Sequence, residues 1–118
     1  MPIDTTELER RIEAARAAAT EFARSVRNEF GPRVERIRLF GSFARGDATL
    51  DSDVDITVIL KRAHWRDRNR ISHLAFHIGA LKHEVVIMPL ILSVTHFKRL
   101  LDRERAVALA IQREGVKL

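Results

Sequence analysis

The chain has 118 residues, of which 46% are hydrophobic and 31% charged, so we expect one globular domain over residues 1–118 rather than a disordered segment. It contains no cysteine, which excludes disulfide bonds, thiolate-bound metals and a cysteine nucleophile. Its formal charge of +5 favours acidic partners such as nucleotides, nucleic acids or acidic protein surfaces.

The amino-terminal segment shows no sign of a targeting signal. Residues 1–6 lack the charged-then-apolar pattern of a signal peptide. The longest apolar run, Val85 to Leu92, is far shorter than the ~20 residues that span a bilayer. We therefore expect a cytoplasmic protein without a membrane partner.

A long amphipathic helix is the first predicted element. Thr6 and Glu9 have the spacing of a capping box, with Thr6 as the N-cap residue. Apolar residues then recur at steps of four and three, and Gly31-Pro32 stops the pattern. The apolar stripe consists of Leu8, Ile12, Ala15, Ala19, Phe22 and Val26.

Two strands joined by a turn and a short helix come next. Val34 to Phe40 alternates between basic and apolar residues, as a strand with two different faces does. Gly41 to Gly46 is predicted to form a turn that runs into a short helix, and Asp47 to Ser52 a polar loop. Val54 to Leu60 is the second predicted strand.

The remaining chain predicts a helix, a third strand and two helical segments. The helix spans Trp65 to Lys82, and the strand spans Glu84 to Leu92. Pro89 removes one hydrogen-bond donor from that strand, which places it at a sheet edge or a bulge. Ser93 can cap the final helices, and Gly115 marks their end. The helix residues expected to face inward are Trp65, Ile71, Leu74, Ile78 and Leu81.

This order of elements predicts an α/β or α+β domain. Three apolar strands separated by helices favour a small mixed sheet of three to four strands with helices packed against it.

Two aspartates at the start of the second strand are the most informative feature. Asp53 and Asp55 are two residues apart, so their side chains project from one face, ~6.5–7 Å apart at Cα. Two ionised carboxylates so placed repel each other in a dry site. A Mg²⁺ ion relieves that repulsion and accepts hard oxygen ligands, and such a pair can hold metal against a triphosphate.

A Gly-Ser turn precedes the acidic pair. Gly41 allows the backbone to approach an anion closely, Ser42 adds a hydroxyl at a helix start, and Arg45 is a candidate phosphate contact. Taken singly, these features are also typical of an ordinary turn, an N-cap and an edge strand. A Walker loop is excluded, because Asp47 and Ala48 stand where its lysine and Ser/Thr belong.

These motifs together resemble the minimal nucleotidyltransferases of the DNA polymerase β-like superfamily. The matching residues are Gly41-Ser42, Arg45-Gly46-Asp47 and Ser52-Asp53-Val54-Asp55. The resemblance implies the fold of that family, ATP as substrate bound through Gly41 and Ser42, and Mg²⁺ held by Asp53 and Asp55. It also implies an antitoxin that pairs with a HEPN-domain toxin and transfers AMP to a hydroxyl on it, with a tyrosine as the expected acceptor.

One departure from the family pattern concerns catalysis. The family often has a third aspartate on the next strand, whereas this chain has none between His83 and Pro89. Glu84 is the one carboxylate near that place, so it is the candidate third catalytic residue, with a solvent-facing strand start as the alternative.

Two further hypotheses stay open beside the enzyme. The missing aspartate favours an antitoxin that neutralises its partner by binding alone. The basic tract Lys61 to Arg70 could contact RNA or an acidic protein, although it lacks a recognised nucleic-acid-binding module. His73 and His77 have a metal-binding spacing on one helix, but no third ligand is evident.

Overall fold

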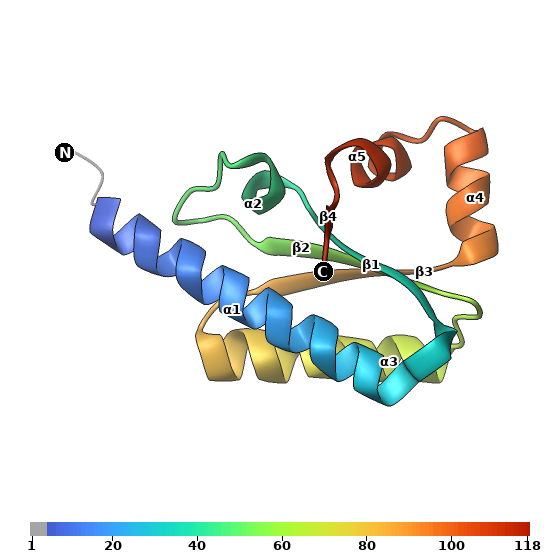
Figure 1. Ribbon diagram of the computed structural model, residues 1–118, viewed down its shortest axis with the longest axis horizontal. Coiled ribbons are helices and arrows are strands. Elements are labelled where there is room, and N and C mark those ends of the chain that lie inside the picture. Colours follow the sequence, from blue (N-terminus) through green and yellow to red (C-terminus); the bar gives the residue numbers. More distant parts are fainter. Residues whose placement is uncertain (1–4) are drawn as a thin grey trace.

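The computed structural model describes residues 5–118, so the signal-peptide argument on the first residues falls largely outside it. Figure 1 shows a twisted sheet with helices on both sides. The strand order is β3 (Ile87–Ser93), β2 (Val54–Leu60), β1 (Val34–Phe40) and β4 (Val116–Lys117), with β2 parallel to β3 and antiparallel to β1. The predicted small mixed sheet is therefore confirmed.

The long first helix covers one face of the sheet. α1 spans Thr5–Phe30 and begins one residue before the expected N-cap residue. A short 3-10 turn, Gly31–Arg33, follows it and ends the helix where Gly-Pro was expected to do so. The apolar stripe of α1 is buried from Ala15 onward, and Phe22 and Val26 are fully buried.

The two strands that carry the candidate site have the predicted bounds. β1 spans Val34–Phe40, and β2 spans Val54–Leu60. In their antiparallel register Phe40 pairs with Asp55. The short helix α2, Ser42–Arg45, connects them at this end of the sheet.

The third strand starts later than predicted. β3 spans Ile87–Ser93 and is the edge strand next to β2, so the edge position inferred from Pro89 is confirmed. Glu84 lies outside the strand because its backbone is left-handed, with φ of 57°, and this conformation ends the preceding helix.

The helix between β2 and β3 changes type along its length. α3, Trp65–Ala75, is α-helical, and η2, Phe76–His83, is a π-helix. The inward orientation expected for Trp65 and Leu81 is wrong, because they are 67% and 60% exposed. Trp65 lies in the first turn, ahead of the part of α3 that packs on the core. Leu81 lies within the π-helical segment, whose wider turns shift the apolar face away from a 3.6-residue period.

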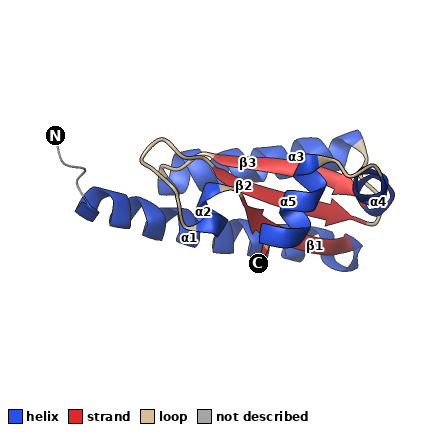
Figure 2. Cartoon of the chain, turned by 90° about the horizontal axis from the view of Figure 1, so that it is seen from above, coloured by secondary structure: helices blue, strands red, loops and turns tan. Residues whose placement is uncertain are grey.

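Two further helices cover part of the second sheet face (Figure 2). α4 spans Val94–Asp102, and α5 spans Ala106–Glu114. The expected cap is present, since Ser93 Oγ accepts a hydrogen bond of 3.0 Å from the His96 N–H. The two-residue strand β4, Val116–Lys117, then pairs with β1.

The core is divided by the sheet. α1, α3 and η2 pack on one face, in the larger cluster of buried apolar residues. α4 and α5 pack on the other face, in a smaller cluster formed by Ile59, Leu92, Phe97, Ala108 and Ile111. None of the helices within residues 5–118 is both long and apolar enough to cross a membrane.

Replacing Phe22 by alanine should lower the free energy of unfolding by about 3–5 kcal/mol, because the ring is fully buried between α1 and the sheet. Urea denaturation followed by circular dichroism measures the change. Leu81→Ala serves as the control, with an expected change within about 0.5 kcal/mol, since that side chain is exposed. Equal losses in the two variants would contradict this placement of the core.

Candidate active site

Gly41, the residue that follows β1, packs closely against the Asp55 side chain. Gly41 has φ of 76° and ψ of −157°, a backbone conformation that L-residues with a Cβ rarely adopt. A Cβ placed on Gly41 would collide with Asp55 Oδ2 and lie 3.2 Å from Asp55 Cγ. Only glycine therefore allows the turn and this carboxylate to occupy neighbouring positions.

The turn continues directly into α2. The N–H groups of Ala44 and Arg45 donate to the Gly41 carbonyl at 3.1 and 3.0 Å. Gly46 ends the helix in a left-handed conformation with φ of 85°. Ser42 is half-buried at the start of this helix, beside the Gly41–Asp55 contact. The Gly-Ser turn and the acidic strand therefore lie next to each other in the structure, as the sequence motif suggested.

The two aspartates lie at the start of β2 and influence each other. Asp53 is exposed immediately before the strand, and Asp55 is half-buried within it. Burial raises the pKa of Asp55, the negative charge of Asp53 raises it further, and the positive charge of Arg45 opposes both effects. All three groups are close enough to interact, and the acidic pair carries a repulsion that a cation would relieve.

Arg45 connects α2 to the carboxyl-terminal helix. Its Nε donates to Asp47 Oδ2 at 3.3 Å, and its Nη1 donates to Glu114 Oε2 at 3.3 Å. These carboxylates raise the pKa of Arg45, the Asp47 hydrogen bond being the larger cause. A phosphate at Arg45 would compete with both partners. Glu114 could not be identified from the sequence, since nothing local to residue 45 points to α5.

Glu84 occupies a different setting from the acidic pair. It is exposed at the end of η2, before β3 begins. Within the described part of the chain, no three His, Cys, Asp or Glu residues form a group that could hold a metal. The position beside Asp55 on the neighbouring strand is occupied by Met88.

The carboxylate pair fits magnesium better than a metal that needs an all-protein cage. Asp53 and Asp55 supply hard oxygen donors, which Mg²⁺ prefers over nitrogen or sulfur. Mg²⁺ commonly binds through one or two carboxylates and completes its shell with water and substrate phosphates. A site with two protein carboxylates and an adjacent glycine turn has this composition.

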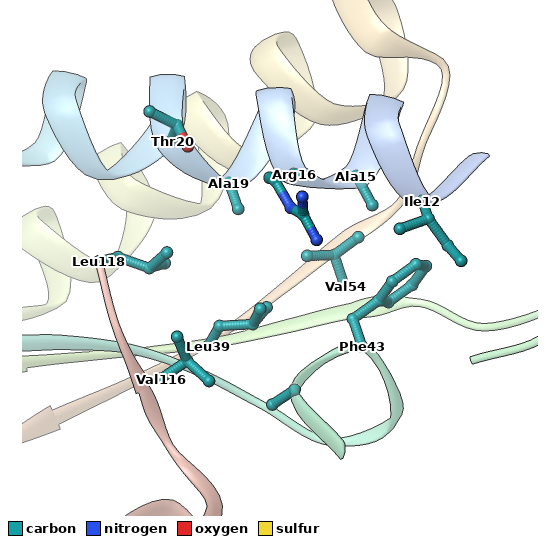
Figure 3. Close-up of a pocket in the computed structure, with 11 residues that line it drawn as sticks. Ile12, Ala15, Arg16, Ala19, Thr20, Leu39, Phe43, Val54, Val116 and Leu118 are labelled. Atoms are coloured by element: carbon teal, nitrogen blue, oxygen red, sulfur yellow. The ribbon is translucent and has the colours of Figure 1, made fainter. Parts of the chain in front are cut away.

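A pocket of about 340 Å³ lies on the other side of the sheet from the carboxylates. Leu39 and Val54 line it, and these residues alternate along their strands with Phe40 and Asp55. Figure 3 shows Arg16 of α1 extending toward Val54. The pocket is therefore separate from the acidic pair.

The basic tract lies at the other end of β2. One of its cations is paired within the fold, because Arg70 Nε donates to Glu29 Oε2 at 2.8 Å. Its acidic residue, Asp67, forms an ion pair with Arg33, which lies outside the tract. The tract follows β2 after Leu60, whereas the aspartates precede or begin that strand. It does not adjoin the acidic pair.

The two histidines of the middle helix lie close together. The ring centroids of His73 and His77 are 4.2 Å apart, and both residues are exposed. Since no described group of three potential ligands exists, this pair stays a surface feature of α3 and η2.

Comparisons with known proteins identify the family. Residues 19–111 match the nucleotidyltransferase domain family, and the chain belongs to it. A candidate protein adenylyltransferase of Methanocaldococcus jannaschii is 32% identical over 76 residues, which are 64% of this chain and 76% of the relative. A second such protein of that organism is 43% identical over 42 residues, covering 36% of this chain and 42% of the relative.

A solved structure supports the same fold. The crystal structure of a candidate nucleotidyltransferase from Sulfolobus solfataricus superposes with a TM-score of 0.58 at 22% sequence identity. The match covers 99% of this chain and 89% of that chain. At this identity the likeness concerns the fold alone.

Replacing Asp53 by asparagine should lower the pKa of Asp55 toward its ordinary value, because one of the two effects that raise it is removed. Burial remains, so the return should be incomplete. A carboxyl ¹³C NMR titration of Asp55 measures the shift. Asp51→Asn is the matched control in the same loop. An unchanged Asp55 titration in Asp53→Asn would show that the two carboxylates do not interact.

Proposed function

We propose that this protein is a Mg²⁺-dependent nucleotidyltransferase that moves AMP from ATP to a hydroxyl on a protein acceptor. Family membership supports nucleotidyl transfer, and the candidate protein adenylyltransferases among the relatives support the AMP donor and the protein acceptor.

The single observation that carries the proposal is the contact between Gly41 and Asp55. The absence of a Cβ at Gly41 leaves room for the Asp55 carboxylate directly beside the Gly-Ser turn. A phosphate-binding turn and a carboxylate pair are the two parts that phosphoryl-transfer sites need next to each other. Here they come from consecutive strands that pair at Phe40 and Asp55.

Each residue of the site has a distinct role in the proposal. Asp53 and Asp55 hold the metal, which when bound neutralises negative charge on the triphosphate. Gly41 and Ser42 bind the β- and γ-phosphates, and Arg45 offsets their charge. The positions of the residues are consistent with these roles. Asp55 is half-buried at the start of β2, Gly41 forms the turn, and Arg45 lies at the end of α2.

The proposed reaction is an in-line displacement at the α-phosphorus. The acceptor oxygen forms a bond to that phosphorus while the bond to the bridging oxygen of the β-phosphate breaks. Pyrophosphate leaves on the side where Gly41 and Ser42 bind phosphate, and the acceptor proton is released to water. AMP stays attached to the acceptor.

The proposed biological setting is an antitoxin whose acceptor is a HEPN-domain toxin in the cytoplasm. A second function, neutralisation by binding alone, is favoured by one observation. Val86, just before β3, and Met88, on β3 beside Asp55, are apolar where a third carboxylate would be expected. The two functions differ in whether they need Asp55.

Asp55→Asn should reduce AMP transfer at least about a hundredfold, because it removes a ligand of the metal that neutralises the triphosphate. The assay combines the protein, Mg²⁺, α-labelled ATP and the product of the adjacent gene, and follows label on the acceptor. Asp51→Asn is the control and should retain activity. Gly41→Ala should resemble Asp55→Asn, since its Cβ would displace the carboxylate.

The same assay separates the two functions and tests Glu84. Neutralisation of the partner without label transfer, unaffected by Asp55→Asn, would support binding alone and contradict the enzyme. Glu84→Gln should change the rate by less than about twofold, because the residue is exposed beyond the strand end. A loss as large as that of Asp55→Asn would assign Glu84 a catalytic role.

A further inference from the structure

Cations without acidic partners gather at the sheet edge formed by β1 and β4. Two come from α1, two from β1 and one from β4. Within residues 5–118, none of them forms an ion pair with an Asp or Glu side chain. We name this group the basic edge, and its members are Arg24, Arg27, Arg36, Arg38 and Lys117.

A groove between α1 and β4 contains three members of the basic edge. Its volume is about 490 Å³, and Arg24, Arg27 and Lys117 line it together with uncharged residues. Arg27 Nη2 donates a 2.9 Å hydrogen bond to the main-chain oxygen of Leu118. Figure 2 shows this end of the chain, marked C, at one edge of the molecule beside α1 and β1. The groove therefore has three cationic side chains and no anionic one among its lining residues.

Arg36 and Arg38 extend the positive charge from this groove onto β1. Ile37 packs in the core cluster under α1, so its two neighbours project from the opposite face of the strand. Burial lowers the pKa of Arg38, and the positive charges of Arg36 and Arg27 lower it further. Arg38 Nη1 donates to the Ile37 carbonyl at 3.1 Å. These guanidinium groups are thus close enough to repel one another, and two of them are held by main-chain oxygens.

The basic edge accounts for the net charge of the whole chain. The sequence has 21 Lys and Arg residues and 16 Asp and Glu residues, which gives the formal charge of +5. Without the five cations of the basic edge, the basic residues would equal the acidic residues in number. A partner with many negative charges is therefore attracted to this edge, where its binding would also relieve the repulsion among the arginines.

The composition of the basic edge favours phosphate over an acidic protein surface. Four of its members are arginines, whose planar forks bind phosphate oxygens in a bidentate manner. Protein interfaces add large apolar or aromatic anchors, but on the described parts of α1, β1 and β4 the one exposed large apolar residue is Val116. Single-stranded nucleic acids require aromatic side chains for base stacking, and the exposed Trp65 and Phe76 lie on α3 and η2. A duplex, whose bases stay paired, needs neither.

We propose that the basic edge binds the sugar-phosphate backbone of a nucleic-acid duplex without reading its sequence. Its side chains replace the cations condensed on the duplex, and the release of those cations drives binding. Contacts to phosphates fix the position of the duplex but carry no sequence information. No member of the basic edge belongs to the Gly-Ser turn or the acidic pair, so this inference does not rest on the proposed function.

The first test measures the affinity of the unaltered protein for a short labelled duplex by fluorescence anisotropy, without nucleotide. RNA and DNA duplexes of unrelated sequences are compared, because both present the same phosphate chemistry. Five phosphate contacts should lower the affinity roughly five-hundredfold between about 50 and 200 mM salt. Affinity should not depend on sequence. A preference for RNA or equal affinity for both duplexes would each support the proposal and would identify the source of the phosphates.

The second test compares two triple variants with the same change in net charge. Each replaces one lysine and two arginines that are exposed, so both should keep the fold. The first variant removes members of the basic edge: Arg24→Gln, Arg36→Gln and Lys117→Gln. The control variant removes cations of the basic tract: Lys61→Gln, Arg62→Gln and Arg66→Gln. At about 50 mM salt the first should bind the duplex at least about a hundredfold more weakly, and the salt effect should fall to roughly tenfold. The control should change the affinity by less than about threefold.

A third measurement uses the unaltered protein alone. In an NMR titration with the duplex, the backbone amide signals of Arg27 and Lys117 should shift, whereas those of Arg62 and Arg66 should not. Equal losses of affinity in the two triple variants would overturn the proposal, since net charge and not the basic edge would then decide binding. Unshifted Arg27 and Lys117 signals, no duplex binding at about 50 mM salt, or tighter binding to single-stranded RNA or poly-glutamate would also overturn it.

Discussion

The close packing of a glycine backbone against one carboxylate is the constraint on which the site depends. Because β1 and β2 pair at Phe40 and Asp55, the residue after Phe40 must share its space with the Asp55 side chain. A glycine at this point avoids a clash between a Cβ and the Asp55 carboxylate, and it also adopts the positive φ of the turn that starts α2. The Gly-Ser turn and the Asp55 carboxylate are thereby brought together by one strand pairing, without any long loop.

The rest of the fold maintains an arrangement that is locally unfavourable. Asp55 is half-buried next to Asp53, and the resulting increase in its pKa means that the ionised form is disfavoured in the folded protein. Burial of apolar side chains on both faces of β2 offsets this energetic cost. Ile56, Val58 and Leu60 pack under α1 and α3, and Ile59 packs under α4 and α5. The strand at whose start the acidic pair lies is also the centre of the core, so both carboxylates are held on a rigid element.

The second sheet face is covered by helices at one end and open to solvent at the other. α4 and α5 cover the end near Ile59 and Leu92, and the ion pair between Arg45 and Glu114 ties α5 to α2. The opposite end, with Asp53, Asp55 and Met88, is left open. This asymmetry leaves the carboxylates accessible to solvent without exposing the core, and it leaves an apolar strand edge beside them.

The sequence by itself determined the elements with strong local signals. The alternation in Val34–Phe40 and the apolar run Val54–Leu60 are strand patterns, and Gly41 and Gly46 mark the turn and helix end between them, so their bounds could be predicted. Tertiary structure decided what depends on partners distant in the chain. The π-helix turned Leu81 outward, the left-handed Glu84 delayed β3, and the register of β3 placed Met88 beside Asp55. Glu114 reached Arg45 only through the packing of α5. Such contacts follow from strand register and helix packing, which neighbouring residues in the sequence do not encode.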